Sequence, residues 1–106
     1  MSTPEGKIKT ALKRELARVP ECYQFWPVQM GLGAATLDCL LCVSGRFVAV
    51  ETKAPGKKLT ARQEITTKAL AKAGAMVYVV DSPAMARAVA DALMVDQVDR
   101  YVGHSL

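Results

Sequence analysis

The sequence lacks the features that mark a membrane or secreted protein. No apolar run in its 106 residues approaches the roughly 18 residues that a membrane-spanning helix needs. The first residues, Met1 to Glu5, have neither the basic start nor the apolar core of a signal peptide. We therefore expect a cytoplasmic protein with no membrane partner.

Histidine and cysteine are also scarce, which argues against a zinc site. His104 is the only histidine, and the three cysteines are Cys22, Cys39 and Cys42. An odd number of cysteines in a cytoplasmic chain is typical of reduced thiols. Cys39 and Cys42 have a C-x-x-C spacing, but on a strand they would point to opposite faces, and no second ligand pair accompanies them. We interpret all three as small apolar side chains.

The stretch from Thr36 to Lys53 predicts a β-hairpin. Two apolar, β-prone runs flank the dipeptide Ser44-Gly45, a typical two-residue hairpin turn. Counting outward from this turn places Asp38 opposite Glu51, with their Cβ atoms about 4.5–5.5 Å apart on one face. Lys53 follows Glu51 by two residues and therefore shares that face.

Two carboxylates so close are destabilising unless a cation compensates them. Magnesium is commonly held by one or two carboxylates together with phosphate oxygens. An ammonium such as that of Lys53 is suited to positioning a water or stabilising negative charge. The alternative is a surface ion pair between Glu51 and Lys53 beside an unrelated Asp38. We favour the metal site, because the paired acids and the lysine occur together.

Positive charge gathers in the part of the chain that carries the hairpin. Residues 1–72 contain 12 of the 14 Lys and Arg and 6 of the 10 acidic residues, a net charge of +6, whereas residues 73–106 have a net charge of −2. This distribution fits a polyanionic partner such as nucleic acid. The alternative is the solvated surface of an ordinary basic protein.

The remaining pattern predicts three helices and two more strands. We predict helices over about 4–18, between Thr60 and Gly74, and over about 83–94, and strands over 22–30 and 75–80. The tail from Val95 to Leu106 is either a short helix or a subunit contact. No internal repeat or low-complexity linker divides the chain, so residues 1–106 are expected to form one domain.

The element order α-β-β-β-α-β-α defines the expected fold class. A helix that links the second hairpin strand to a near-continuously apolar strand implies a parallel crossover. We therefore predict an α/β fold with a mixed β-sheet flanked by helices. The apolar spacing places Ile65, Ala69 and Leu70 on one face of the second helix. It places Met85, Val89 and Leu93 on the core side of the third.

Glu5 has two possible roles, whereas Gln63 has one. Glu5 lies at the start of the buried stripe of the first helix, where it either interacts with the helix dipole or supplies a third carboxylate to the acidic end of the hairpin. Gln63 follows Thr60 by three residues and forms a capping box with it, which is a structural role.

Taken together, these motifs resemble the PD-(D/E)xK nuclease superfamily, with its restriction-endonuclease-like core. The finer resemblance is to the small virus-type replication-repair nuclease (VRR-NUC) domains. That family usually has proline immediately before the strand aspartate, where this chain has Leu37. The matching elements are Glu5, Asp38, Glu51-Thr52-Lys53, Leu59-Thr60-Ala61-Arg62-Gln63, Gly74 and Val77-Tyr78-Val79-Val80.

The resemblance implies a metal-dependent DNA endonuclease. Lys53 would orient the attacking water and offset charge on the phosphoryl group, and Gln63 would lie beside the site. The implied cofactor is Mg²⁺ or Mn²⁺, with Asp38, Glu51, the main-chain carbonyl of Thr52 and Glu5 as ligands. The DNA-contacting residues that we expect are Lys7, Lys57, Lys58 and Arg62.

The resemblance also implies a homodimer acting on branched DNA, such as four-way (Holliday) junctions, in a bacterial or phage-infected host cytosol. Two active sites on one dimer suit paired nicking of a symmetric junction. Three alternatives remain: a nuclease acting on flap or linear duplex DNA, a non-catalytic DNA-binding module of the same fold, and a structural protein with a chance ion pair.

Overall fold

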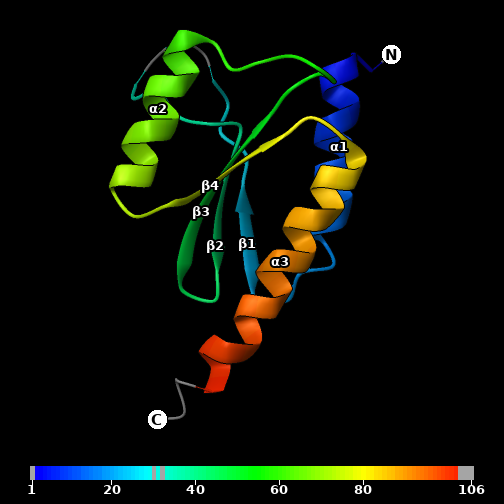
Figure 1. Cartoon of the computed structure of the whole chain (residues 1–106), viewed down its shortest axis with the longest axis vertical. Coiled ribbons are helices and arrows are strands. Elements are labelled where there is room, and N and C mark those ends of the chain that lie inside the picture. Colours follow the sequence, from blue (N-terminus) through cyan, green and yellow to red (C-terminus); the bar gives the residue numbers. More distant parts are fainter. Residues whose placement is uncertain (1, 30, 32, 103–106) are drawn as a thin grey trace.

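A four-stranded sheet with helices on both sides makes up the protein (Figure 1). The structure, a computed structural model, describes residues 2–29, 31 and 33–102. The predicted α/β class, mixed sheet and element order are confirmed. The elements are α1 (Pro4–Leu16), β1 (Cys22–Phe25), β2 (Cys39–Val43), β3 (Arg46–Thr52), α2 (Ala61–Lys72), β4 (Met76–Val80) and α3 (Pro83–Val102).

The hairpin between β2 and β3 has the predicted register. Antiparallel pairing runs from Val43 with Arg46 to Cys39 with Val50. Ser44 has a φ angle of 48° and Gly45 one of 83°. Positive φ at both central residues is the geometry of a two-residue turn whose twist matches that of the flanking strands. The turn therefore sets the register on which the positions of the two acidic residues depend.

The sheet has the order β1-β2-β3-β4, and β4 lies parallel to β3. As predicted, α2 provides the crossover between these two strands. Helices α1 and α3 pack together on one side of the sheet, and α2 lies on the other side (Figure 1). The sheet is thus covered by two helices on one side and by a single helix on the other.

The core lies between the sheet and the pair α1 and α3. Every second residue of β2 is buried, as expected for a strand with one covered face. Leu37, at the position where the resembled family has proline, is fully buried. The core residues include Ile8, Leu12 and Leu16 of α1, Cys39, Leu41 and Val43 of β2, Val48 and Val50 of β3, and Ala86, Val89, Ala90 and Leu93 of α3.

Two predicted elements are shorter in the structure. Helix α1 ends at Leu16 rather than Arg18, because the amides of Arg18 and Val19 bond three residues back and tighten the last turn ahead of Pro20. Strand β1 ends at Phe25 rather than near residue 30, since Pro27 cannot donate to a ladder. Met30 lies outside the described residues.

The apolar face predicted for α2 is not the side that packs against the sheet. Ile65 is 70% exposed and Ala69 is exposed, while the partly buried positions are Gln63, Thr66, Thr67 and Leu70. No residue of α2 is buried. The apolar periodicity misled the prediction because the side of α2 that faces the sheet is largely polar.

Helix α3 is longer than predicted, continuing past Met94 to Val102. Neither glycine nor proline occurs between Ala84 and Val102, so nothing in the sequence stops the helix. Met85, predicted to be in the core, is 43% exposed. Residues 103–106 of the tail lie outside the described part of the chain. Within the described part, no helix combines the length and apolarity that crossing a bilayer requires.

We expect the two sides of the molecule to differ sharply in sensitivity to truncation. Leu12→Ala should lower the free energy of unfolding by about 2–5 kcal/mol, because it leaves a cavity in the core. Ile65→Ala should change it by less than about 0.5 kcal/mol, since that side chain faces solvent. Urea unfolding measures both. A loss for Ile65→Ala as large as that for Leu12→Ala would contradict the orientation of α2.

Candidate active site

Asp38 and Glu51 lie opposite each other at the open end of the hairpin. Pairing ends at Cys39 with Val50, so the next pair outward is Asp38 with Glu51, as the predicted register requires. Glu51 is 3% exposed, and the Asp38 side chain is 12% exposed. The fold thus buries two carboxylates side by side.

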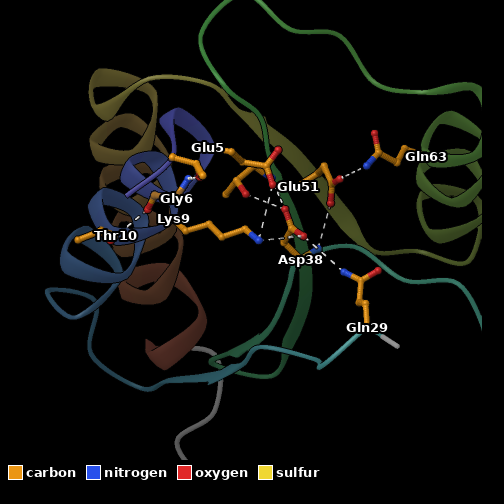
Figure 2. A network of polar contacts seen from close by, with 10 residues as sticks. Glu5, Gly6, Lys9, Thr10, Gln29, Asp38, Glu51 and Gln63 are labelled. Atoms are coloured by element: carbon orange, nitrogen blue, oxygen red, sulfur yellow. Dashed lines mark hydrogen bonds and ion pairs between the residues drawn. The ribbon is translucent and has the colours of Figure 1, made fainter. Parts of the chain in front are cut away.

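Hydrogen bonds between the two strand ends hold both carboxylates in place (Figure 2). The Asp38 amide donates to Glu51 Oε1 at 3.0 Å. In return, the Thr52 amide at 3.0 Å and the Thr52 hydroxyl at 2.6 Å both donate to Asp38 Oδ2. Sequence reasoning assigned only the Thr52 carbonyl to the site and missed the hydroxyl. The remaining Asp38 oxygen, Oδ1, is thereby directed away from Thr52.

Glu51 has an unusual protonation equilibrium. Burial, followed by the negative charge of Asp38, raises the pKa of Glu51 to about 7. The Asp38 amide and the positive charge of Lys53 lower this pKa in part, and the charge of Glu5 raises it. The site is therefore electrostatically unfavourable for two ionised carboxylates unless an additional cation is present.

Gln63 contacts the site from α2 and also begins that helix. Its Nε2 donates to Glu51 Oε2, and its Oε1 accepts from the Thr60 amide at 3.0 Å. The Thr60 hydroxyl completes the capping box by accepting a hydrogen bond from the backbone N–H of Gln63. One side chain therefore couples the start of α2 to Glu51, so both roles considered for Gln63 coexist in the structure.

Lys53 is nearly buried, at 8% exposure, and directly follows β3. Its amide donates to the Val80 carbonyl, which extends the pairing of β3 with β4. Within residues 2–29, 31 and 33–102, its ammonium forms no ion pair or hydrogen bond. A cation held this way near Glu51 is available to an incoming anion.

Lys9 links Glu5 to the site, a contact that the sequence did not predict. Lys9 Nζ lies 3.6 Å from Glu5 Oε2 and 3.8 Å from Asp38 Oδ1 (Figure 2). Gln29 Nε2 also approaches Asp38 Oδ1, at 3.4 Å. The i, i+4 spacing of Glu5 and Lys9 was the available signal, but it gave no indication of the contact with Asp38.

A pocket of about 420 Å³ opens over these residues. Its walls include Glu5 of α1, Asp38 and Glu51 of the hairpin, and Arg62 and Gln63 of α2. Loop residues 27–29, 31 and 33–36 form much of the remaining wall.

The other predicted DNA contacts lie away from this pocket. Lys7, Lys57 and Lys58 are exposed but are not part of the pocket wall. Arg62 alone of the four predicted contacts borders it.

The donor atoms at the site suit a hard divalent cation rather than zinc. Asp38, Glu51 and the Thr52 carbonyl offer oxygen, the ligand that Mg²⁺ prefers. Cys39 is buried and Cys42 exposed, and burial raises the pKa of the Cys39 thiol to about 12, which disfavours a thiolate.

Glu5 does not complete a three-acid metal site in this structure. Within the part of the chain that the structure describes, no three His, Cys, Asp or Glu side chains gather as metal ligands. The acidic donors available together are therefore two, a number that Mg²⁺ sites accept because the ion keeps several waters.

Comparison with known proteins supports the fold. A solved structure described as a VRR_NUC domain matches with a TM-score of 0.66 and 23% sequence identity, over 99% of this chain and 100% of that one. No protein-family model matches the sequence, and no curated protein matches it. At this level of identity the likeness concerns the fold: the chain has the fold of a VRR_NUC domain, as its motifs suggested.

The pKa of Glu51 predicts an unusual pH dependence of stability without metal. Between its ordinary value of 4.5 and about 7, the folded state keeps a proton that the unfolded chain has released. The contribution of Glu51 to the free energy of unfolding is therefore fully present below about pH 4.5. It is lost as the pH rises through 7, which lowers the free energy of unfolding by roughly 3 kcal/mol. Thermal unfolding in EDTA across this range measures the loss.

Glu51→Gln should remove this penalty. In EDTA at about pH 8 we expect the variant to be more stable than the parent by roughly 2 kcal/mol, because an amide avoids the charge but keeps only one of two acceptor contacts. Glu64→Gln, at an exposed position of α2, is the matched control and should change little. A variant less stable than the parent under these conditions would contradict the electrostatic account.

Proposed function

We propose that the protein is a DNA endonuclease that depends on a divalent metal ion. The observation that carries the proposal is the pair Asp38 and Glu51 at one end of the hairpin, with Lys53 near enough to lower the pKa of Glu51. Two carboxylates and a nearly buried ammonium form a site that is incomplete until a cation and an anion are added. A cation together with a phosphodiester meets both requirements, and the fold of a VRR_NUC domain supports this class of chemistry.

Asp38, Glu51 and the carbonyl of Thr52 would hold Mg²⁺ or Mn²⁺, with Glu5 bordering the same pocket. When bound, such an ion supplies positive charge that offsets a phosphate and makes a neighbouring water more acidic. Thr52 fixes Asp38 by two hydrogen bonds, and Gln63 fixes Glu51 by one. The carboxylates are therefore preorganised before any ligand arrives.

Lys53 would act directly on the reaction. Among residues 2–29, 31 and 33–102 its ammonium forms no hydrogen bond or ion pair, so it would be able to orient a water against phosphorus and to offset charge that develops on the phosphate oxygens. Arg62, at the wall of the pocket, would contact a neighbouring phosphate of the DNA backbone. Lys7, Lys57 and Lys58 would add phosphate contacts farther along the strand.

Cleavage of synthetic DNA tests the proposal. With Mg²⁺ or Mn²⁺ the parent should cleave DNA, and EDTA should abolish cleavage. Lys53→Ala should lower the rate by about 10²–10³-fold, as expected for loss of one group that stabilises the transition state. Asp38→Asn should leave no measurable activity.

The control for charge is Lys72→Ala, an exposed residue in the last turn of α2. It should cleave like the parent, and all three variants should still bind DNA. Metal-dependent cleavage by Lys53→Ala at the parental rate would contradict the role of Lys53. Binding without cleavage by the parent would indicate a non-catalytic DNA-binding module.

We further propose that the substrate is branched DNA and that the enzyme is a homodimer. An uncharged part of the sheet supports the dimer. Strand register brings Tyr23, Cys42 and Phe47 into one row and Phe25, Leu40 and Ala49 into the next, on the face not covered by α1 and α3. Tyr23 is 73% exposed, Phe25 54% and Phe47 47%.

The area of this aromatic surface fits a second copy of the chain. Aromatic side chains bury about 150–250 Å² each, so these three expose roughly 350 Å² per monomer. Two copies would bury about 700 Å² of aromatic surface, close to half of a standard interface. The flanking side chains would supply the remainder. A dimer would present two sites, which suits a junction with two-fold symmetry.

Sedimentation velocity tests the dimer. The parent should sediment as a dimer at micromolar concentration, and Phe47→Glu should weaken association by about 100-fold or more, because it places like charges across a two-fold axis. Ile65→Glu, at a more exposed apolar position on α2, should remain dimeric.

A monomeric parent would overturn the dimer, and a dimeric Phe47→Glu would overturn this face as its interface. If the parent is monomeric and Phe47→Glu loses DNA affinity, the face contacts DNA instead. Comparing four-way junction, flap and linear duplex substrates tests the preference for branched DNA.

A further inference from the structure

Lys9 occupies a position at the candidate site that the proposed chemistry does not explain. Its ammonium lies between Glu5 and Asp38, 3.6 Å and 3.8 Å from their nearest oxygens (Figure 2). Among residues 2–29, 31 and 33–102, the ion pairs formed by acidic residues of the site all involve Lys9. Lys9 is therefore the present counter-ion of this cluster.

The oxygens of Asp38 are not equivalent. Oδ2 accepts two hydrogen bonds from Thr52, so its lone pairs are engaged. Within the described part of the chain, the polar groups that approach Oδ1 are Lys9 Nζ at 3.8 Å and Gln29 Nε2 at 3.4 Å. A divalent cation that binds Asp38 would therefore take Oδ1, the same oxygen that Lys9 approaches.

Lys9 is held loosely enough to leave. Both of its ion pairs exceed the length of a hydrogen bond, and its side chain is 38% exposed. An exposed ion pair of this kind changes an equilibrium constant by about fivefold at most. Lys9 can thus neutralise the acids without blocking a dication, which gains far more from the same oxygens.

We propose that Lys9 is a tethered competitor of the divalent cation: it neutralises Asp38 and Glu5 in the metal-free protein and leaves Asp38 Oδ1 when the metal binds. This inference rests on the proposed function, since it requires Asp38 and Glu51 to bind the metal. Its consequence is that Lys9 stabilises the empty site and weakens metal binding. The affinity for the metal is then set partly by a residue that is not a ligand.

Calorimetric titration with Mg²⁺ or Mn²⁺ alone, without DNA, tests this role. Lys9→Met keeps the aliphatic stem but removes the charge. We expect it to bind the metal about fivefold more tightly than the parent, equivalent to about 1 kcal/mol at 1.4 kcal/mol per tenfold change. Lys7→Met removes the same charge from an exposed position on α1 and is the matched control.

The control separates competition from general repulsion between charges. Lys7 is exposed and is not part of the pocket wall, so salt screening should leave Lys7→Met binding the metal within about twofold of the parent. Tighter binding by Lys9→Met alone supports competition at Oδ1. Equal affinities for the two variants would overturn the role of Lys9.

Thermal unfolding supplies a second readout. In EDTA, Lys9→Met should melt at a lower temperature than the parent, because Glu5 and Asp38 lose their counter-ion. In saturating metal this difference should disappear or reverse, since the parent must displace Lys9 and the variant need not. A difference that stays the same with and without metal would mean that Lys9 is only a surface ion-pair residue.

Different results would overturn the metal-dependent function and the role of Lys9. If the parent, Lys7→Met and Lys9→Met all fail to bind Mg²⁺ or Mn²⁺, the metal-dependent function is overturned and the Lys9 inference with it. If the parent binds metal and Lys9→Met binds it no more tightly than Lys7→Met, the Lys9 inference alone is overturned.

Discussion

Three hydrogen bonds between the open ends of β2 and β3 are the interaction on which the candidate site depends. The Asp38 amide bonds to Glu51, and the amide and hydroxyl of Thr52 bond to Asp38. Hydrogen bonds to charged groups contribute roughly 1.5–3 kcal/mol each. They exist only in one register, because a slip of one residue would send the two side chains to opposite faces. The turn at Ser44-Gly45 and the buried side of both strands maintain that register.

The charged and polar groups of the site lower the stability of this small protein. Glu51 is buried beside Asp38, and the nearly buried Lys53 forms no ion pair in the described part of the chain. The side of α2 facing the sheet carries polar residues, and the buried Thr67 hydroxyl has no hydrogen-bond partner among the described residues. The packed core on the other side of the sheet, with α1 and α3, offsets these costs. Such local conflicts are expected where a surface is shaped for binding rather than for stability.

Local signals made the hairpin and the ends of α2 predictable. A two-residue turn with alternating apolar residues defines register without any knowledge of distant contacts, so the pairing of Asp38 with Glu51 followed. The capping box of Thr60 and Gln63 was equally local. The expectation that Gln63 lies beside the site came only with the family resemblance, and its contact with Glu51 was not predicted, because it depends on how α2 lies against the sheet.

The features that the sequence did not reveal depend on packing between distant elements. Lys9 meets Asp38 only because α1 docks beside the end of β2, and its spacing from Glu5 has no bearing on that. Apolar periodicity grouped Ile65 with Ala69 and Leu70 on one face, but Ile65 is exposed because this helix turns polar residues toward the pocket.

The central claim is that Asp38 and Glu51 hold a divalent cation at the end of the hairpin. Anomalous diffraction from crystals grown with Mn²⁺ tests it most directly. The account predicts one strong anomalous peak between the two carboxylates, next to the Thr52 carbonyl. A peak bound elsewhere, or density in which Asp38 and Glu51 remain without metal at saturating Mn²⁺, would contradict it.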